Sequence, residues 1–136
     1  FIHQSPSLKA NRAELIELAP SFGETLQLVN ILRDETDDAD YGRRYIPNVQ
    51  ARTQLEAIAQ ESLAKAVRYI GLLEAGKAAP RIIAFNTLNL ALAKETLALV
   101  AKLGPGVKLP RERVTKLHAT ILALTASGES VSDIFE

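Results

Sequence analysis

The sequence predicts an all-α fold, and three observations support this prediction. Of the 136 residues, 47% are apolar but only 5% are aromatic. The core must therefore consist mainly of Leu, Ile, Val and Ala, a mixture that favours helices over a β-sandwich. Apolar residues also recur at helical spacing over long segments, and no segment shows the alternation of a half-buried strand. The length suits about one domain.

The first helices are bounded by residues with strong capping and breaking preferences. Asn11 is placed to cap a short helix that runs through Leu18. Pro20 suits the first turn of a second helix, where its missing N–H costs nothing. We expect that second helix to run to about Tyr41 and to stop at Gly42.

A long third helix follows a short linker and ends at Gly76, before Pro80 restarts the chain. Its core-facing side is predicted from residues three and four apart: Leu55, Ile58, Ala59, Ser62, Ala66, Ile70 and Leu73. We also expect Tyr69 to lie in the core.

The fourth helix, from about Arg81 to Leu103, is apolar around much of its circumference, which predicts a central position. Phe85 on this helix is expected to be a core residue. Gly104-Pro105-Gly106 then breaks the chain. A last helix, from about Pro110 to Ala126, has Val114, Leu117, Ile121 and Leu124 at helical spacing, and Ser127 to Glu136 is predicted to be a frayed tail.

Charge and composition argue against several classes of function. Sixteen basic residues balance sixteen acidic ones, so the basic surplus of a nucleic-acid binder is missing. The absence of cysteine excludes disulfides and thiolate metal sites and is compatible with the cytoplasm. The least polar segment, Arg81 to Val100, is interrupted by polar residues and does not predict a membrane span. No signal peptide is visible at the start of the sequence. Because the chain begins with Phe1 and not with an initiator methionine, we expect it to be a fragment or a cleaved product of a longer protein.

A polar stripe runs along an otherwise apolar helix. At about 100° per residue, an arc of roughly 80° contains Gln27, Asn30, Asp34 and Asp38. The other faces of this helix carry Leu26, Leu28, Val29 and Leu32. A core helix with such a stripe is expected to line a cavity.

Metal-bridged diphosphate binding needs side chains of this kind. Magnesium prefers hard oxygen ligands, which Asp34 and Asp38 can supply from neighbouring turns and Asn30 from the turn before. Arg33 and Arg43 are placed to counter phosphate charge. On spacing alone, a solvated helix face with ordinary ion pairs explains the same residues equally well.

The longer string around these residues resembles the second aspartate-rich motif of the squalene/phytoene synthase family. It comprises Asn30-Ile31-Leu32-Arg33-Asp34, Asp38, Gly42-Arg43 and Tyr45-Ile46-Pro47, with Gln27 at the position of the family's preceding glutamine. Val107-Lys108-Leu109 and Arg111 resemble, more loosely, the basic segment that opens the family's last helix.

The resemblance implies an isoprenoid synthase type of helical bundle that condenses two prenyl diphosphates, farnesyl or geranylgeranyl, head to head. The product would be of the squalene or phytoene type and would form through a cyclopropylcarbinyl diphosphate. By position, Asn30, Asp34 and Asp38 would bind Mg²⁺, and the two aspartates would serve catalysis. Gln27, Arg33, Arg43 and Tyr45 would contact substrate. NADPH would be needed only for a squalene-type product.

The sequence also departs from this family. The family's first aspartate-rich motif has no counterpart in residues 1–26, so residues 1–136 are interpreted as one partial domain, the C-terminal part of the family domain. This fragment alone is expected to be inactive. The alternative is a non-catalytic scaffold or assembly relative that keeps the fold. A head-to-tail prenyl synthase or a terpene cyclase fits the Gly42-Arg43 and Tyr45-Ile46-Pro47 ending less well.

The expected partners are prenyl diphosphates, with no nucleic acid. Because such substrates and products are poorly soluble, we expect a cytoplasmic protein that works at a membrane surface. Lys108, Arg111, Arg113 and Lys116 are interpreted as the solvated start of a helix, with phosphate or membrane contact as the alternative. His118 and His3 have no partners at zinc-site spacing and are expected to be structural or surface residues.

Overall fold

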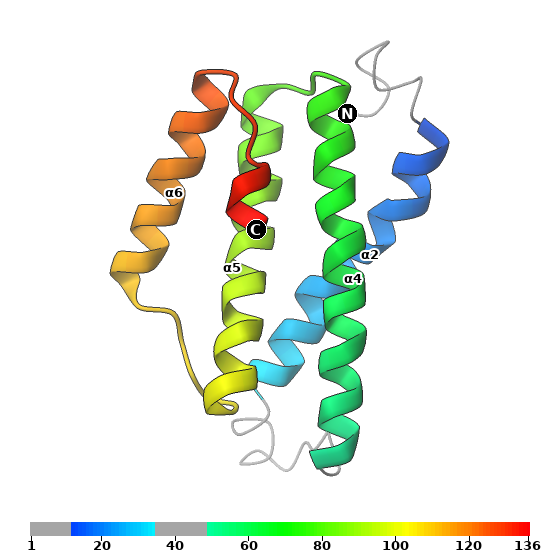
Figure 1. Ribbon diagram of the computed structural model, residues 1–136, viewed down its shortest axis with the longest axis vertical. Helices are drawn as coiled ribbons and strands as arrows, with labels where there is room; N and C mark the ends of the chain where they lie inside the picture. The colour runs from blue at the N-terminus through cyan, green and yellow to red at the C-terminus, as the bar shows by residue number, and fades with distance from the viewer. Residues whose placement is uncertain (1–11, 35–48) are drawn as a thin grey trace.

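The computed structural model describes residues 12–34 and 49–136, and all of its regular structure is helical. The described residues form α-helices and a short terminal 3₁₀-helix, arranged as Figure 1 shows. They are α2 (Arg12–Arg33), α4 (Val49–Ala75), α5 (Pro80–Leu103), α6 (Arg111–Ala126) and η2 (Ser132–Phe135). No strand occurs in these two ranges, so the all-α prediction is confirmed for the described residues.

Helix α5 is the central element, as its sequence predicted. It packs against α2, α4, α6 and η2, and Figure 1 shows it between α4 and α6 with η2 alongside. Buried residues recur along its whole length: Ala84, Thr87, Leu90, Ala91, Ala93, Thr96, Leu97 and Val100. Because α5 is apolar on several sides, it can form one core with α2 and α4 and a second with α6.

The predicted break before Pro20 is wrong, because α2 is one helix from Arg12 to Arg33 with Pro20 inside it. A proline in a helix removes one backbone hydrogen bond and crowds the carbonyl four residues earlier. Here Pro20 and Ile16 are both exposed, so water can reach that carbonyl. The continuous helix also buries Leu15 and Leu18 in one core cluster and Val29 and Leu32 in another. The predicted continuation to Tyr41 lies outside the described residues.

Helix α4 confirms the predicted third helix, with one exception on its buried face. Ala59, Ser62, Ala66, Ile70 and Leu73 are buried and Leu55 is partly buried. Ile58 was assigned to the same face but is 44% exposed. At 100° per residue Ile58 lies at the edge of the stripe, beside Ala59, which takes the buried position.

The end of α4 is a Schellman motif in which a lysine occupies the left-handed position. The N–H of Ala78 donates to the carbonyl of Leu73, and the N–H of Lys77 donates to that of Glu74, both at 3.0 Å. Lys77 has φ 56°, whereas the sequence had suggested that Gly76 ends the helix. Leu73 and Ala78 lie in the same core cluster, which is the apolar contact that accompanies this motif.

The C-terminal segment corrects one prediction. Residues after Ala126 were expected to fray, but Val131 is fully buried in a cluster with Leu63, Ala66, Ile70 and Leu90, and η2 follows it.

Phe85 was expected in the core but is 68% exposed. It lies on a side of α5 that its described neighbours do not cover, whereas Tyr69 is buried as predicted.

By length and composition, α5 could also cross a membrane, although the sequence analysis did not predict a span there. Only one helix in the described ranges meets this criterion. The central helix of a bundle satisfies the same criterion, and α5 packs against four other elements. We therefore interpret α5 as a core helix.

Candidate functional site

The polar stripe predicted from the sequence lies on the last turns of α2. Gln27 and Asn30 are exposed, and Arg33 and Asp34 are half-buried. The core side of the same turns carries Val29 and Leu32, which are 2% and 0% exposed. The helix therefore holds the polar side chains away from the core. Three predicted site residues lie outside the described residues: Asp38, Arg43 and Tyr45.

Arg33 and Asp34 form a two-point ion pair at the end of α2. The Arg33 Nε donates to Asp34 Oδ1 at 2.8 Å, and an Nη donates to Oδ2 at 3.1 Å. This pairing lowers the pKa of Asp34 below its usual value and raises the pKa of Arg33, although partial burial opposes both shifts. Asp34 is therefore ionised at neutral pH, as a carboxylate that binds a cation must be.

A distant loop meets the end of α2 at this ion pair. The N–H of Gly106 donates to the carbonyl oxygen of Arg33 at 2.7 Å. That carbonyl is one of the last four of the helix, which have no partner within it. Val107 packs against the cluster that contains Val29 and Leu32. The charge of Lys108, the next residue, contributes to the lowered pKa of Asp34.

Lys108 has an electrostatic role at the end of α2. A carboxylate at a helix C-terminus meets the negative end of the helix dipole, which is unfavourable. Arg33 and Lys108 supply compensating positive charge at Asp34. Lys108 was predicted to belong to the basic start of the last helix, and its effect on Asp34 was not predicted. No sequence signal links the two residues, because only the tertiary fold brings them together.

A small cavity opens between α2 and α5 beside the ion pair. Its volume is about 200 Å³, and it is lined by Leu26, Val29, Asn30, Arg33, Asn89, Leu92, Ala93 and Thr96. Asn30 and Arg33 were predicted as site residues, whereas Asn89 and Thr96 were not. The Asn89 amide nitrogen donates to the carbonyl of Phe85 at 2.9 Å, which leaves its side-chain oxygen to accept other bonds.

The described residues offer part of a magnesium site. Asp34 uses one lone pair on each oxygen for Arg33, and a carboxylate has about four such positions, so it can still bind a cation. Asn30 is exposed one turn earlier and can add an amide oxygen. These are hard oxygen donors of the kind that Mg²⁺ prefers. Among the described residues, no group of three His, Cys, Asp or Glu side chains gathers to hold a metal.

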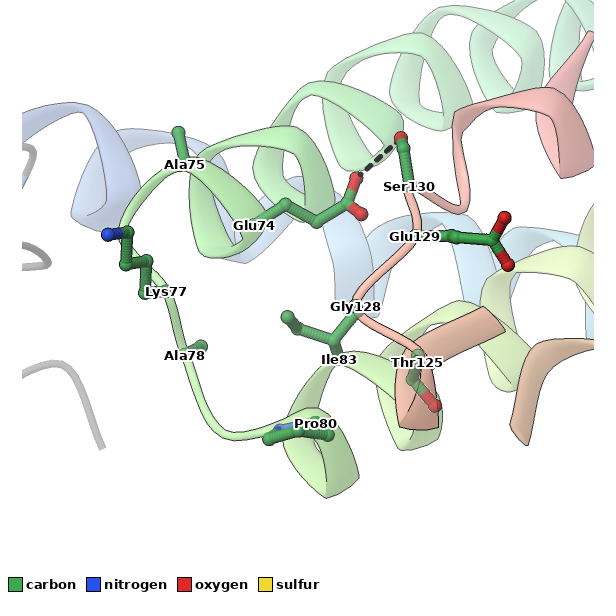
Figure 2. Close-up of a pocket in the computed structure, with 10 residues that line it drawn as sticks. All are labelled: Glu74, Ala75, Lys77, Ala78, Pro80, Ile83, Thr125, Gly128, Glu129 and Ser130. Carbon is green, nitrogen blue, oxygen red and sulfur yellow. Dashed lines mark hydrogen bonds between the residues drawn. The ribbon is translucent and has the colours of Figure 1, made fainter. Parts of the chain in front are cut away.

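A second, larger cavity lies at the C-terminal end of α4, and none of the predicted site residues lines it. Its volume is about 440 Å³, and Figure 2 shows it between the end of α4, the start of α5 and the loop after α6. Glu74 accepts hydrogen bonds from the Ser130 hydroxyl at 3.3 Å and the Val131 N–H at 3.1 Å. Because both carboxylate oxygens bind the chain itself, we interpret Glu74 as an anchor for the C-terminal segment.

Comparison with known proteins gives one match. The family model described as squalene/phytoene synthase matches residues 3–51, less than half of the chain. This range includes the stripe, the ion pair and the motif residues through Pro47, but not the loop around Lys108. No curated protein and no solved structure matches the chain. Residues 3–51 are therefore similar to part of the squalene/phytoene synthase family, in agreement with the resemblance of the motif, and the all-helical structure of the described residues is consistent with an isoprenoid synthase type of bundle.

Proposed function

We propose that the protein is a prenyl transferase that condenses two prenyl diphosphates head to head and releases diphosphate. The observation that carries this proposal is the end of α2. There, an ionised Asp34 is held by Arg33 and lies beside a cavity lined by Asn30. All three residues lie within the segment that matches the family model. Farnesyl and geranylgeranyl diphosphate are the proposed substrates.

The residues of α2 would act on the diphosphate group rather than on the prenyl chain. Asn30, Asp34 and Asp38 would hold Mg²⁺, which when bound neutralises the charge of a leaving diphosphate. Arg33 keeps Asp34 ionised and oriented, and its remaining N–H groups are available for phosphate oxygens. Gln27, Arg43 and Tyr45 would contact substrate as the family resemblance implies. The prenyl chains would make the protein act at a membrane surface in the cytoplasm.

The test is Mg²⁺-dependent turnover of the full-length protein with farnesyl or geranylgeranyl diphosphate, measured as released diphosphate and extracted product. Asp34→Asn keeps the side-chain size but removes the charge, and we expect turnover to fall on the order of 100-fold. Asp133→Asn is the matched control, because Asp133 is exposed in η2 and outside the proposed site. It should leave turnover unchanged.

The products also separate the alternatives. Head-to-head condensation to a hydrocarbon releases two diphosphates per product, whereas a head-to-tail synthase releases one and leaves a longer prenyl diphosphate. NADPH dependence distinguishes a squalene-type product from a phytoene-type product. If the wild-type protein neither binds Mg²⁺ with a prenyl diphosphate nor releases diphosphate, the proposal is wrong. The non-catalytic scaffold then becomes the better interpretation.

A further inference from the structure

Helix α2, which crosses α4 obliquely in Figure 1, packs its two ends into different cores. Leu15 and Leu18 are buried with residues of α4 in one cluster. Val29 and Leu32 are buried with residues of α4 and α5 in another. Between Leu18 and Val29, Thr25 is the only buried side chain of α2. The helix therefore joins two well-packed halves through a less buried stretch.

The helix is weakest in this stretch, between Pro20 and Thr25. Pro20 has no N–H to donate to the carbonyl of Ile16. Gly23 has a low helix propensity, and packing does not require glycine there, because it is exposed and an added Cβ would have no atom within 4 Å. The Thr25 hydroxyl donates to the Ser21 carbonyl at 2.7 Å, a kind of bond that often bends helices. All three features favour a bend at this place.

The cavity beside the ion pair is lined by α2 only beyond this stretch. Its lining residues are Leu26, Val29, Asn30 and Arg33 from α2 and Asn89, Leu92, Ala93 and Thr96 from α5. A bend between Pro20 and Thr25 therefore changes the width of the cavity and leaves the first half of α2 packed. Ser62 on α4 donates to Glu24 at 3.0 Å, which ties the stretch itself to α4 as a pivot.

We propose that α2 bends between Pro20 and Thr25 and thereby widens the cavity between α2 and α5 to admit the prenyl chain of a substrate. This inference rests on the proposed function. The cavity has a volume of about 200 Å³, whereas pockets that hold small ligands have roughly 300–1,000 Å³. Its apolar lining suits a prenyl chain, and Arg33 connects it to the proposed metal site. The continuous helix of the structure is the narrow form, and the bent helix is the wide form.

The competing explanation is that Pro20 and Gly23 are tolerated on an exposed face of a stiff helix. Gly23→Ala separates the two explanations, because alanine favours the continuous helix. A stiff helix would become more stable and would bind ligands as before. A bending helix would also become more stable, but its wide form would be less populated, so only ligands that need the wide form would bind more weakly.

The experiment compares two ligands by titration calorimetry of the full-length protein with Mg²⁺. Inorganic diphosphate does not need the wide cavity, whereas an unreactive thio analogue of farnesyl diphosphate does. We expect Gly23→Ala to weaken binding of the analogue on the order of fivefold and to leave diphosphate binding within about twofold of wild type. Pro20→Ala should act in the same direction, because it restores the missing backbone hydrogen bond.

Gly71→Ala is the matched control. Gly71 is exposed in α4, and an added Cβ there also has no atom within 4 Å. The substitution should stabilise the protein by an amount similar to Gly23→Ala in urea unfolding, which also shows that each variant is folded. It should leave both affinities unchanged, because Gly71 lies outside α2 and outside the cavity lining.

The outcomes distinguish this inference from the proposed function. If wild-type protein binds both ligands, but Gly23→Ala and Pro20→Ala bind the analogue as tightly as wild type, α2 is stiff and the inference is wrong, while the proposed function stands. If Gly71→Ala weakens analogue binding equally, general stabilisation explains the effect and the inference is also wrong. The same holds if the α2 variants weaken diphosphate binding as much as analogue binding. If wild-type protein binds neither ligand with Mg²⁺, the proposed function fails and this inference fails with it.

Discussion

Replacing Val131 by alanine is expected to destabilise the protein, although the sequence places this residue in a frayed tail. Val131 is 0% exposed and packs with Leu63, Ala66, Ile70 and Leu90. The substitution removes two methyl groups, each worth about 0.8 kcal/mol of apolar transfer, and leaves a cavity. We therefore expect the free energy of unfolding to fall by about 2 kcal/mol.

The anchor that holds this segment can be tested separately. Glu74 accepts the Val131 N–H at 3.1 Å and the Ser130 hydroxyl at 3.3 Å. Glu74→Ala removes both acceptors and leaves a half-buried N–H without its partner, at a cost of about 1–2 kcal/mol. Because Glu74 binds the backbone of Val131, the two substitutions should be coupled, and the double variant should lose less than the sum.

Urea unfolding, followed by far-ultraviolet circular dichroism, measures the free energy of unfolding of each variant. A loss of stability alone lowers the urea concentration at the midpoint and leaves the slope of free energy against urea unchanged. Asp133→Ala is the control, because Asp133 is an exposed residue of the same segment and should change stability by no more than about 0.5 kcal/mol. If Val131→Ala and Glu74→Ala also stay within that limit, the Val131 side chain and the Glu74 hydrogen bonds do not hold the segment in place. The segment would then be frayed, as its sequence suggests.

Three further substitutions or conditions test other features of the structure. Lys77→Gly should stabilise the protein by up to about 1 kcal/mol in urea unfolding, because Lys77 has φ 56° in a position that favours glycine. A loss of stability would contradict the left-handed backbone conformation of Lys77. Thr87→Val should raise the midpoint of thermal unfolding, because the Thr87 hydroxyl is buried without a partner among the described residues. A lower midpoint would mean that the hydroxyl makes a stabilising hydrogen bond. Thr25→Val is its control and should not be stabilising, because the Thr25 hydroxyl donates to Ser21 at 2.7 Å. Burial raises the pKa of Tyr69 above 10.0, so Tyr69 ionises first in the unfolded state, and the free energy of unfolding should fall as pH rises above about 10. Urea titrations across the alkaline range should show a smaller fall for Tyr69→Phe. An equal fall in this variant would contradict the role of Tyr69.

The sequence was sufficient to predict the helices α4, α5 and α6 because the breaks between them depend on local chemistry. Gly104-Pro105-Gly106 cannot continue a helix, and α5 ends at Leu103 as predicted. The long apolar run of α5 also predicted its central place. The stripe of Asn30 and Asp34 was visible for the same reason, since 3.6 residues per turn place both on one side of α2.

Predictions failed where a local preference competed with packing between distant residues. Pro20 is locally a helix breaker, but α2 continues through it because Leu15 and Val29 reach separate core clusters from one helix. Phe85 is locally a core residue, yet the described neighbours of α5 leave it 68% exposed. In both cases the packing of distant parts of the chain decided the outcome, and no local pattern predicts that packing.

Local patterns in the sequence were enough to predict the helical class, the boundaries of α5 and α6, and the carboxylate and amide residues proposed to bind a metal. What surrounds those residues depends on how the helices pack. Gly106 is far from Arg33 in the chain, yet its N–H binds the Arg33 carbonyl at 2.7 Å and brings Lys108 to Asp34. The physical reason is that capping groups and counter-charges can come from any part of the chain, so their source depends on how the helices pack.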